Sequence, residues 1–237
     1  MAKLVQKSGY IKSGKASGYM RYIATREGVE KLAGNGAVTK GQRELIQKLL
    51  TDFPDAVELF EYEDYCKTPT LGTASAFITM ALDANLHGID SESGYMQYIA
   101  TRPRVQKHGS HGLFSSSTSV DLASAMSELE SHEGNVWTII YSLRREDAAR
   151  LEFDNADAWR TLLMENAPTL AKSMKISLDN FHWYAAFHDE GHHPHIHMMV
   201  WSDDPKEGFL TKDGIAAMRS KLTNAIFRDE MQQIYER

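Results

Sequence analysis

Histidines are concentrated in one short stretch of the last quarter of the sequence. Five of the ten histidines lie between residues 188 and 197, within FHDEGHHPHIHMMVWS. His195 and His197 are two residues apart, so on a β-strand their side chains leave the same face. His188 ends the preceding alternating segment and lies across from them in an antiparallel hairpin. Three converging imidazoles predict a site for a divalent metal ion with open coordination positions.

The residues around these histidines fit a metal site to different degrees. Pro194 fixes the entry into the second strand, and Asp189 or Glu190 can accept the outer ring N–H of a ligand histidine. His192 and His193 belong to the loop and fit the ligand role less well. Imidazole ligands suit zinc, manganese or nickel, whereas magnesium is unusual without carboxylates. The alternative is a polar hairpin whose histidines are partly exposed and bind no metal.

The hydrophobic pattern predicts an α/β (α+β) protein with a central antiparallel sheet that positions the hairpin. Strands are expected at residues 3–11, 135–143, 180–188 and 195–202. Amphipathic spacing predicts helices at residues 41–53, 73–86, 119–131, 155–174 and 211–236. We expect the H-x-H strand near the centre of the sheet and helices chiefly on one face. Residues 1–237 are predicted to form one domain with a helical insertion near residues 40–90.

Composition and charge limit the classes of function. The single cysteine, Cys66, and an N-terminus without an apolar signal segment favour an intracellular protein, and no stretch is apolar enough to insert into a membrane. The net charge is −6, yet residues 1–48 hold ten Lys or Arg against three acids, while residues 49–97 hold one Lys against nine acids. This pattern favours a focused basic face on an acidic body over a uniform polycation.

The chain also contains one sharp internal repeat. SGYMRYIATR at residues 17–26 returns as SGYMQYIATR at residues 93–102, and the copies differ only at their fifth position. Each copy has the apolar spacing of a helix that starts at a serine N-cap, Ser17 or Ser93. Because the flanking sequences diverge at once, the repeat predicts two similar local elements and excludes a solenoid.

These motifs together resemble the relaxase domain of conjugative and mobilizable elements. The segments that carry the resemblance are YIATREGVEKL, NVWTIIYSLRREDAARL and the stretch from Trp183 to Ser202, in which His195-Ile196-His197 matches a His-hydrophobe-His motif. The chain is similar in particular to the MobP and MobL classes of the HUH endonucleases. That resemblance implies metal-assisted nicking of origin-of-transfer DNA, in which a tyrosine becomes joined to the 5′ phosphate. It also implies accessory relaxosome proteins, a coupling protein and a bacterial cytoplasmic location.

The repeat supplies two candidates for that tyrosine. Tyr22 occupies the place usual in the family, and Tyr98 has the same local setting. Arg26 or Arg102, one helical turn further on, is placed to hold a phosphate or to favour the phenolate. Tyr22 also has Arg21 beside it, and a phenol with a reference pKa of about 10 is more easily ionised near cations. We therefore expect Tyr22 to be the nucleophile and Tyr98 to be the alternative, although two nucleophiles acting in turn would also explain the repeat.

The basic segments predict a groove for single-stranded DNA, held mainly through phosphate contacts. Its expected members are Lys12, Lys15, Arg21, Arg26, Arg102, Arg104 and Lys107. Three other functions remain open from the sequence. They are a replication-initiator nickase of the same superfamily, an unrelated three-histidine hydrolase or oxygenase, and a DNA-binding relative that does not cleave.

Overall fold

The chain falls into two compact units in a computed structural model. One unit comprises Met1–Ile11 with Ser91–Arg237, and the other comprises Lys12–Asp90. The structure describes residues 3–10, 36–85, 92–101, 105–107, 110–117, 119–189 and 193–228. No helix within these ranges is long and apolar enough to cross a membrane.

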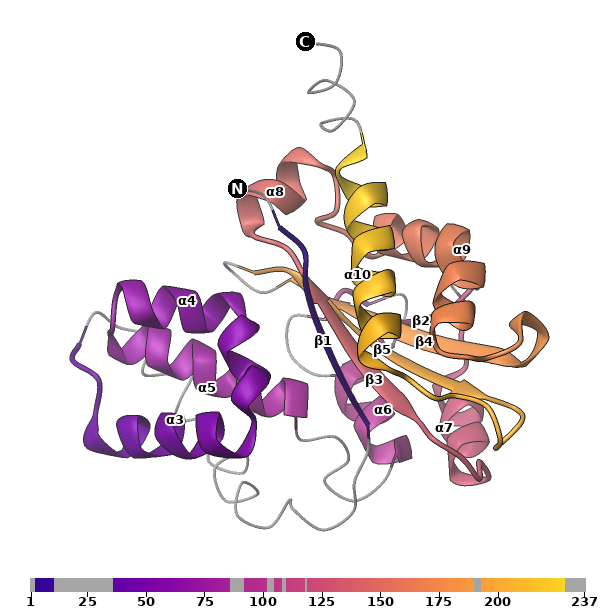
Figure 1. Cartoon of the computed structure of the whole chain (residues 1–237), viewed down its shortest axis with the longest axis horizontal. Helices are drawn as coiled ribbons and strands as arrows, with labels where there is room; N and C mark the ends of the chain where they lie inside the picture. Colours follow the sequence, from indigo (N-terminus) through magenta and orange to yellow (C-terminus); the bar gives the residue numbers. More distant parts are fainter. Residues whose placement is uncertain are drawn as a thin grey trace. The chain divides into compact units, whose positions relative to one another are not determined.

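A five-stranded antiparallel sheet forms the centre of the first unit (Figure 1). The strands are β1 (Val5–Tyr10), β2 (Leu113–Phe114), β3 (Trp137–Ser142), β4 (Phe181–His188) and β5 (His195–Ser202). Their order across the sheet is β1-β3-β5-β4-β2, so the H-x-H strand is central, as predicted. All four predicted strands are present, and β2 is a two-residue edge strand that the sequence analysis did not identify.

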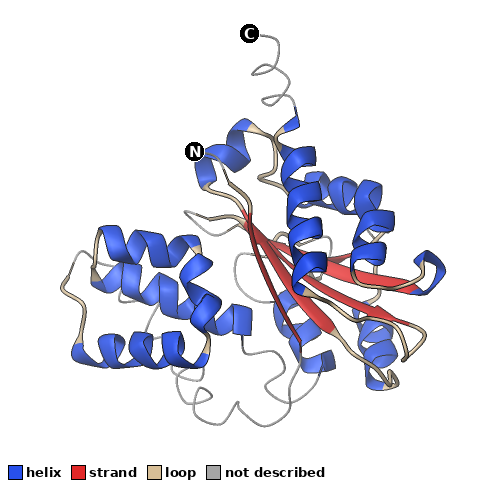
Figure 2. Ribbon diagram, viewed as in Figure 1, coloured by secondary structure: helices blue, strands red, loops and turns tan. Residues whose placement is uncertain are grey.

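Two long helices cover one face of this sheet (Figure 2). They are α9 (Ala156–Ser173) and α10 (Lys212–Ile226), and the short helix α8 (Arg145–Arg150) precedes them. Helix α9 begins at the N-cap Asn155, whose side chain accepts a 2.9 Å hydrogen bond from the backbone N–H of Ala158. Trp159 of α9 and Met218 of α10 are fully buried in the same cluster as Ile196 of β5. This cluster is the main hydrophobic core of the unit.

Shorter helices cover the opposite face. They are α6 (Glu92–Thr101) and α7 (Leu122–Glu130), which lie behind the sheet in Figure 1. Ile99 of α6 packs with Ala186 of β4 and Met199 of β5 in a second buried cluster. The prediction of helices chiefly on one face is therefore wrong, because the sheet has an apolar strip on each side. Ser93 lies inside α6, so it is not the N-cap that the repeat predicted.

The described part of the second unit is helical, and two of its helices match those predicted at residues 41–53 and 73–86. It contains α3 (Lys40–Asp52), η1 (Pro54–Glu58), α4 (Phe60–Lys67) and α5 (Leu71–Asn85). A capping box starts α3, because Thr39 and Gln42 exchange hydrogen bonds between side chain and backbone. The Gln42 side chain also donates to the backbone oxygen of Leu71 and to Ser75 Oγ, which connects α3 to α5.

A carboxylate fixes the segment that follows β5. Glu207 accepts hydrogen bonds from Ser202 Oγ at 2.7 Å, from the Ser177 backbone N–H at 3.1 Å and from the Ser177 hydroxyl. Asn180, the last residue of η2 (Leu178–Asn180), donates to it at 3.3 Å. These donors stabilise the ionised form, so the pKa of Glu207 is lowered to about 2.

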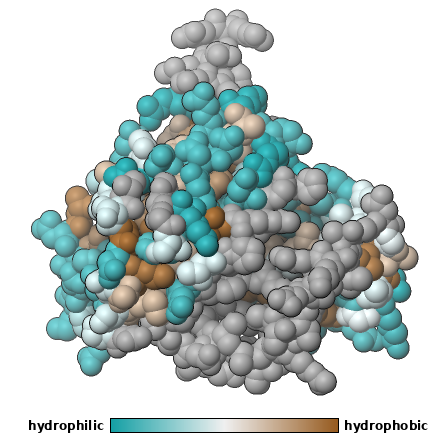
Figure 3. Space-filling model, turned by 180° about the vertical axis from the view of Figure 1, so that it is seen from behind, coloured by the Kyte–Doolittle hydropathy of each residue, from teal (hydrophilic) through white to brown (hydrophobic). Residues whose placement is uncertain are grey.

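Most of the coloured surface seen from behind in Figure 3 is hydrophilic, and hydrophobic residues form smaller patches on it.

Candidate metal centre

The hairpin of β4 and β5 brings the three predicted histidines together. His188 is paired directly with His195, and His197 is the next residue on that face of β5. The ring centroids are 5.2 Å apart for His188 and His195, 4.6 Å for His188 and His197, and 5.0 Å for His195 and His197. One ring nitrogen from each residue lies within 4.8 Å of those of the other two. This spacing allows all three nitrogens to bind a single ion.

The three rings are inside the protein. Each of the three histidines has no exposed surface, so they are not the partly exposed side chains of a polar hairpin. The strand alternation explains how they are held, because Ile196 and Met198 point from β5 into the core on the opposite face. Burying three imidazoles is costly unless their nitrogens are bound, so a cluster of this kind is characteristic of a ligand site.

Hydrogen bonds to backbone carbonyls determine which ring nitrogen carries the proton in two of the histidines. His188 Nε2 lies 2.9 Å from the backbone oxygen of Ile99, and His195 Nδ1 lies 3.0 Å from the backbone oxygen of His193. A carbonyl oxygen only accepts, so the ring nitrogen in each pair donates. In the neutral rings, the lone pair is then on Nδ1 of His188 and on Nε2 of His195, and both of these atoms are buried. The donor set therefore has the chemistry that a divalent transition metal requires.

The carboxylates predicted to support the histidines are placed differently. Asp189 accepts a 2.5 Å hydrogen bond from the guanidinium of Arg145, at the start of α8, and more than half of the Asp189 side chain is exposed. Glu190 lies outside the described residues. The outer nitrogens of His188 and His195 are held by the carbonyls of Ile99 and His193, which the sequence analysis did not identify.

The predicted nucleophiles and basic residues are only partly within the described chain. Tyr22 lies outside it, as do Lys12, Lys15, Arg21, Arg26, Arg102 and Arg104, while Lys107 is exposed. Tyr98 belongs to α6, although its side chain is not described. The residue after it, Ile99, provides the carbonyl that binds His188. The second copy of the repeat therefore contacts the histidine cluster through its backbone.

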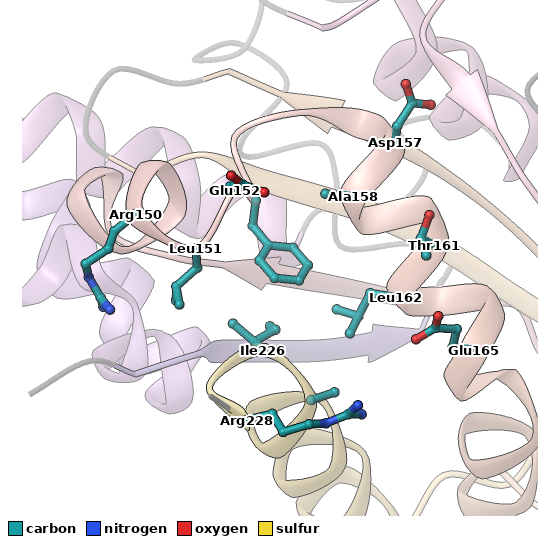
Figure 4. Close-up of a pocket in the computed structure, with 12 residues that line it drawn as sticks. Arg150, Leu151, Glu152, Asp157, Ala158, Thr161, Leu162, Glu165, Ile226 and Arg228 are labelled. Carbon is teal, nitrogen blue, oxygen red and sulfur yellow. The ribbon is translucent and has the colours of Figure 1, made fainter. Parts of the chain in front are cut away.

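A separate pocket lies between α8, α9 and α10. Its volume is about 730 Å³, and it is lined by residues of these helices and of the loop after α8, without any of the three histidines. Its apolar lining includes Leu151, Leu162 and Ile226, and its charged lining includes Arg150 and Asp157 (Figure 4). The sheet separates the helices that line this pocket from the histidine face.

The fold and the site define a mixed α/β protein with a buried three-histidine candidate metal centre on the central strand of an antiparallel sheet. The family model of the MobL relaxases matches residues 1–237, and the chain belongs to this family of DNA relaxases. Searches of the curated proteins and of the solved structures gave no match.

Proposed function

We propose that this protein nicks one strand of origin-of-transfer DNA with a tyrosine nucleophile and a divalent metal ion bound by His188, His195 and His197. The observation that carries the proposal is the buried histidine cluster in a chain that the MobL relaxase family covers from end to end. Two of its rings have tautomers fixed by carbonyls, which supports a ligand role over a structural one. Manganese, zinc and magnesium are the candidate ions.

The proposed reaction exchanges one phosphoester for another. The tyrosine oxygen forms a bond to phosphorus while the bond from phosphorus to the 3′ oxygen breaks. The phenolic proton leaves to solvent, and the departing 3′ oxygen takes up a proton, so atoms and charge balance without net hydrolysis. A bound ion supplies positive charge that stabilises the phosphoryl oxygens. The protein holds two of the ligand rings, His188 and His195, in one orientation by their hydrogen bonds to the backbone oxygens of Ile99 and His193.

We place the nucleophile at Tyr22, because Arg21 and Arg26 make the first copy of the repeat the more basic one. Tyr98 is the alternative, and the contact of its helix with His188 through Ile99 supports it. Changing each tyrosine to phenylalanine separates the two, since phenylalanine keeps the ring and removes the reacting oxygen. We expect Tyr22→Phe to lose the covalent DNA adduct and Tyr98→Phe to retain it. The opposite result would transfer the role to Tyr98, and two active single variants with an inactive double variant would indicate a pair of nucleophiles.

The proposed substrate is single-stranded DNA, held by the basic residues at 12, 15, 21, 26, 102, 104 and 107. Accessory relaxosome proteins, a coupling protein and the bacterial cytoplasm complete the proposed setting. Asp189 remains a proposed supporting group, and it would act by holding Arg145 at the histidine end of the hairpin. Binding should weaken steeply with salt, because each phosphate contact releases a counterion.

The decisive experiment is denaturing electrophoresis after incubation of the protein with metal and single strands from the DNA that flanks its gene. The proposal predicts a slower covalent species that His197→Ala abolishes while much of the DNA affinity remains. A metal-dependent product without a covalent species would instead favour a three-histidine hydrolase. Cleavage at a replication origin, and not at an origin of transfer, would favour an initiator nickase.

A further inference from the structure

We infer that Lys7 and Ser142 extend the histidine cluster across the sheet and bind the scissile phosphate through its non-bridging oxygens. This inference deepens the proposed function and rests on it. Both residues were outside the predicted site, since neither belongs to the histidine motif or to the repeat. They lie on β1 and β3. Strand β3 pairs with β5, and β1 pairs with β3 at the edge of the sheet.

The strand register places both side chains on the histidine face. Ser142 is paired directly with His195, and Lys7 is paired with Ile140, which is itself paired with His197. Directly paired residues in an antiparallel sheet point to the same side. Ser142 therefore adjoins His195 at a Cβ separation of about 4.5–5.5 Å. Lys7 is the diagonal neighbour of Ser142 at about 7–8 Å, so the long side chain of Lys7 can reach Ser142.

Both groups are polar and buried, which is the second observation. Ser142 is 3% exposed and Lys7 is 4% exposed, and the Nζ atom of Lys7 is buried. Among the residues that the structure describes, the buried Oγ of Ser142 has no hydrogen-bond partner. A buried hydroxyl is normally hydrogen-bonded, and Lys7 brings a cationic side chain to the same face of the sheet. An anionic ligand on this face would accept hydrogen bonds from both groups.

The chemistry of the two groups selects the ligand. Ammonium and hydroxyl groups both donate hydrogen bonds, and an ammonium group adds positive charge, so together they favour a phosphoryl oxygen. In the displacement proposed above, negative charge is carried by the non-bridging oxygens while the bonds to the tyrosine and the 3′ oxygen are exchanged. Donors fixed in a buried site stabilise that charge without reorganising. Lys7 and Ser142 are therefore assigned as residues that touch the reacting phosphate.

Four variants test this assignment. Lys7→Met removes the charge at nearly constant length, Lys7→Arg retains the charge, and Ser142→Ala removes the hydroxyl. Lys172→Met is the matched control, because Lys172 is exposed on α9, which packs against the opposite face of the sheet. On a strand with a mapped cleavage position, Lys7→Met should slow adduct formation by about 100-fold. Ser142→Ala should slow it by about tenfold, as expected for the loss of one hydrogen bond to a phosphoryl oxygen. The rate of adduct formation with Lys7→Arg should stay close to that of the wild type, and the rate with Lys172→Met should equal the wild-type rate.

A substrate change distinguishes phosphate binding from a purely structural role. A methylphosphonate at the cleavage position replaces one non-bridging oxygen with a methyl group, and its two diastereomers expose the two oxygens separately. If Lys7 binds one of them, the penalty of Lys7→Met should almost disappear for one diastereomer and persist for the other. A residue that only supports the fold would give the same penalty with both, and that result would overturn the assignment. Melting temperatures of all variants show whether each one is folded.

A binding measurement without metal keeps the inference testable if the proposed nicking fails. With oligothymidine as the probe and a chelator present, the salt dependence of binding should fall by about 0.7 in logarithmic slope for Lys7→Met, the value of one phosphate contact on a single strand. It should be unchanged for Lys172→Met. If wild-type protein forms no adduct, the proposed function is wrong, and an unchanged slope for Lys7→Met would then reject the phosphate site as well. If adducts form at wild-type rate with Lys7→Met and Ser142→Ala, only the inference fails.

Discussion

Adding manganese or zinc to the purified protein should raise its melting temperature, because the three histidine ligands converge only in the folded hairpin. A ligand that binds the native state alone stabilises it by about 2.7 kcal/mol at a concentration about 100-fold above its dissociation constant. The unit that contains the sheet has 11 residues in Met1–Ile11 and 147 in Ser91–Arg237, which is 158 residues. For a unit of this size, about 2–4 °C corresponds to 1 kcal/mol, so the expected rise is about 5–11 °C.

The assay is thermal unfolding in a chelator and again with increasing metal, followed by fluorescence. Replacing His188, His195 and His197 together by alanine should abolish the rise, since no ligand nitrogen remains. His182→Ala is the matched control, because His182 lies on the same strand as His188, six residues away, and bonds to Asp203 at 2.7 Å. This variant should keep the full rise. An equal rise in the triple variant would show that the ion acts elsewhere, and no rise in the wild type would refute the metal centre.

Three further predictions concern the stability of the unit. Trp159→Ala should lower the free energy of unfolding by about 3–5 kcal/mol in urea titrations, because it empties a fully buried site and loses the 2.8 Å hydrogen bond to the backbone oxygen of Phe153. The pKa of Glu207 is lowered from 4.5 to about 2. Its contribution to the stability of the folded protein is therefore complete above its pKa in the unfolded chain, and it is lost as the pH falls from about 4.5 towards 2. The stability difference between wild type and Glu207→Gln should shrink across that window, and a constant difference would contradict the assignment. Arg145→Met should change the free energy of unfolding by less than about 1 kcal/mol, since its ion pair with Asp189 is partly exposed to solvent.

The parts of the fold that follow a local pattern could be predicted from the sequence. The strands at 180–188 and 195–202 and the convergence of their histidines follow from a period of two and a short connection. The long helices follow from their amphipathic spacing. Helix α8 and strand β2 span six and two residues, which is too short for a periodic signal. The sequence pattern did not predict the apolar strip on the second face of the sheet, because the helices that cover it, α6 and α7, come from segments distant in the chain.

The supporting groups of the site could not be read from the sequence for a different reason. The Ile99 carbonyl is 89 positions from His188 along the chain, and a backbone oxygen has no signature in the sequence. Ser142 and Lys7 adjoin the cluster only through the register of β1, β3 and β5, which depends on long-range pairing. Sequence reasoning favoured Asp189 because it is next to His188, whereas the fold directs that carboxylate towards Arg145.

Side chains of β5 point alternately to the candidate metal centre and to the hydrophobic core, so correct formation of one requires correct formation of the other. A slip of one residue in the pairing of β5 would turn His195 and His197 into the apolar cluster and bring Ile196 and Met198 to the opposite face. Such a mispaired sheet would lose its packing and its ligand set at once, so a chain that has folded has also assembled the centre. Insertion of one residue within β5 should therefore be far more damaging than a change of length between residues 189 and 194, which leaves the pairing of the two strands intact.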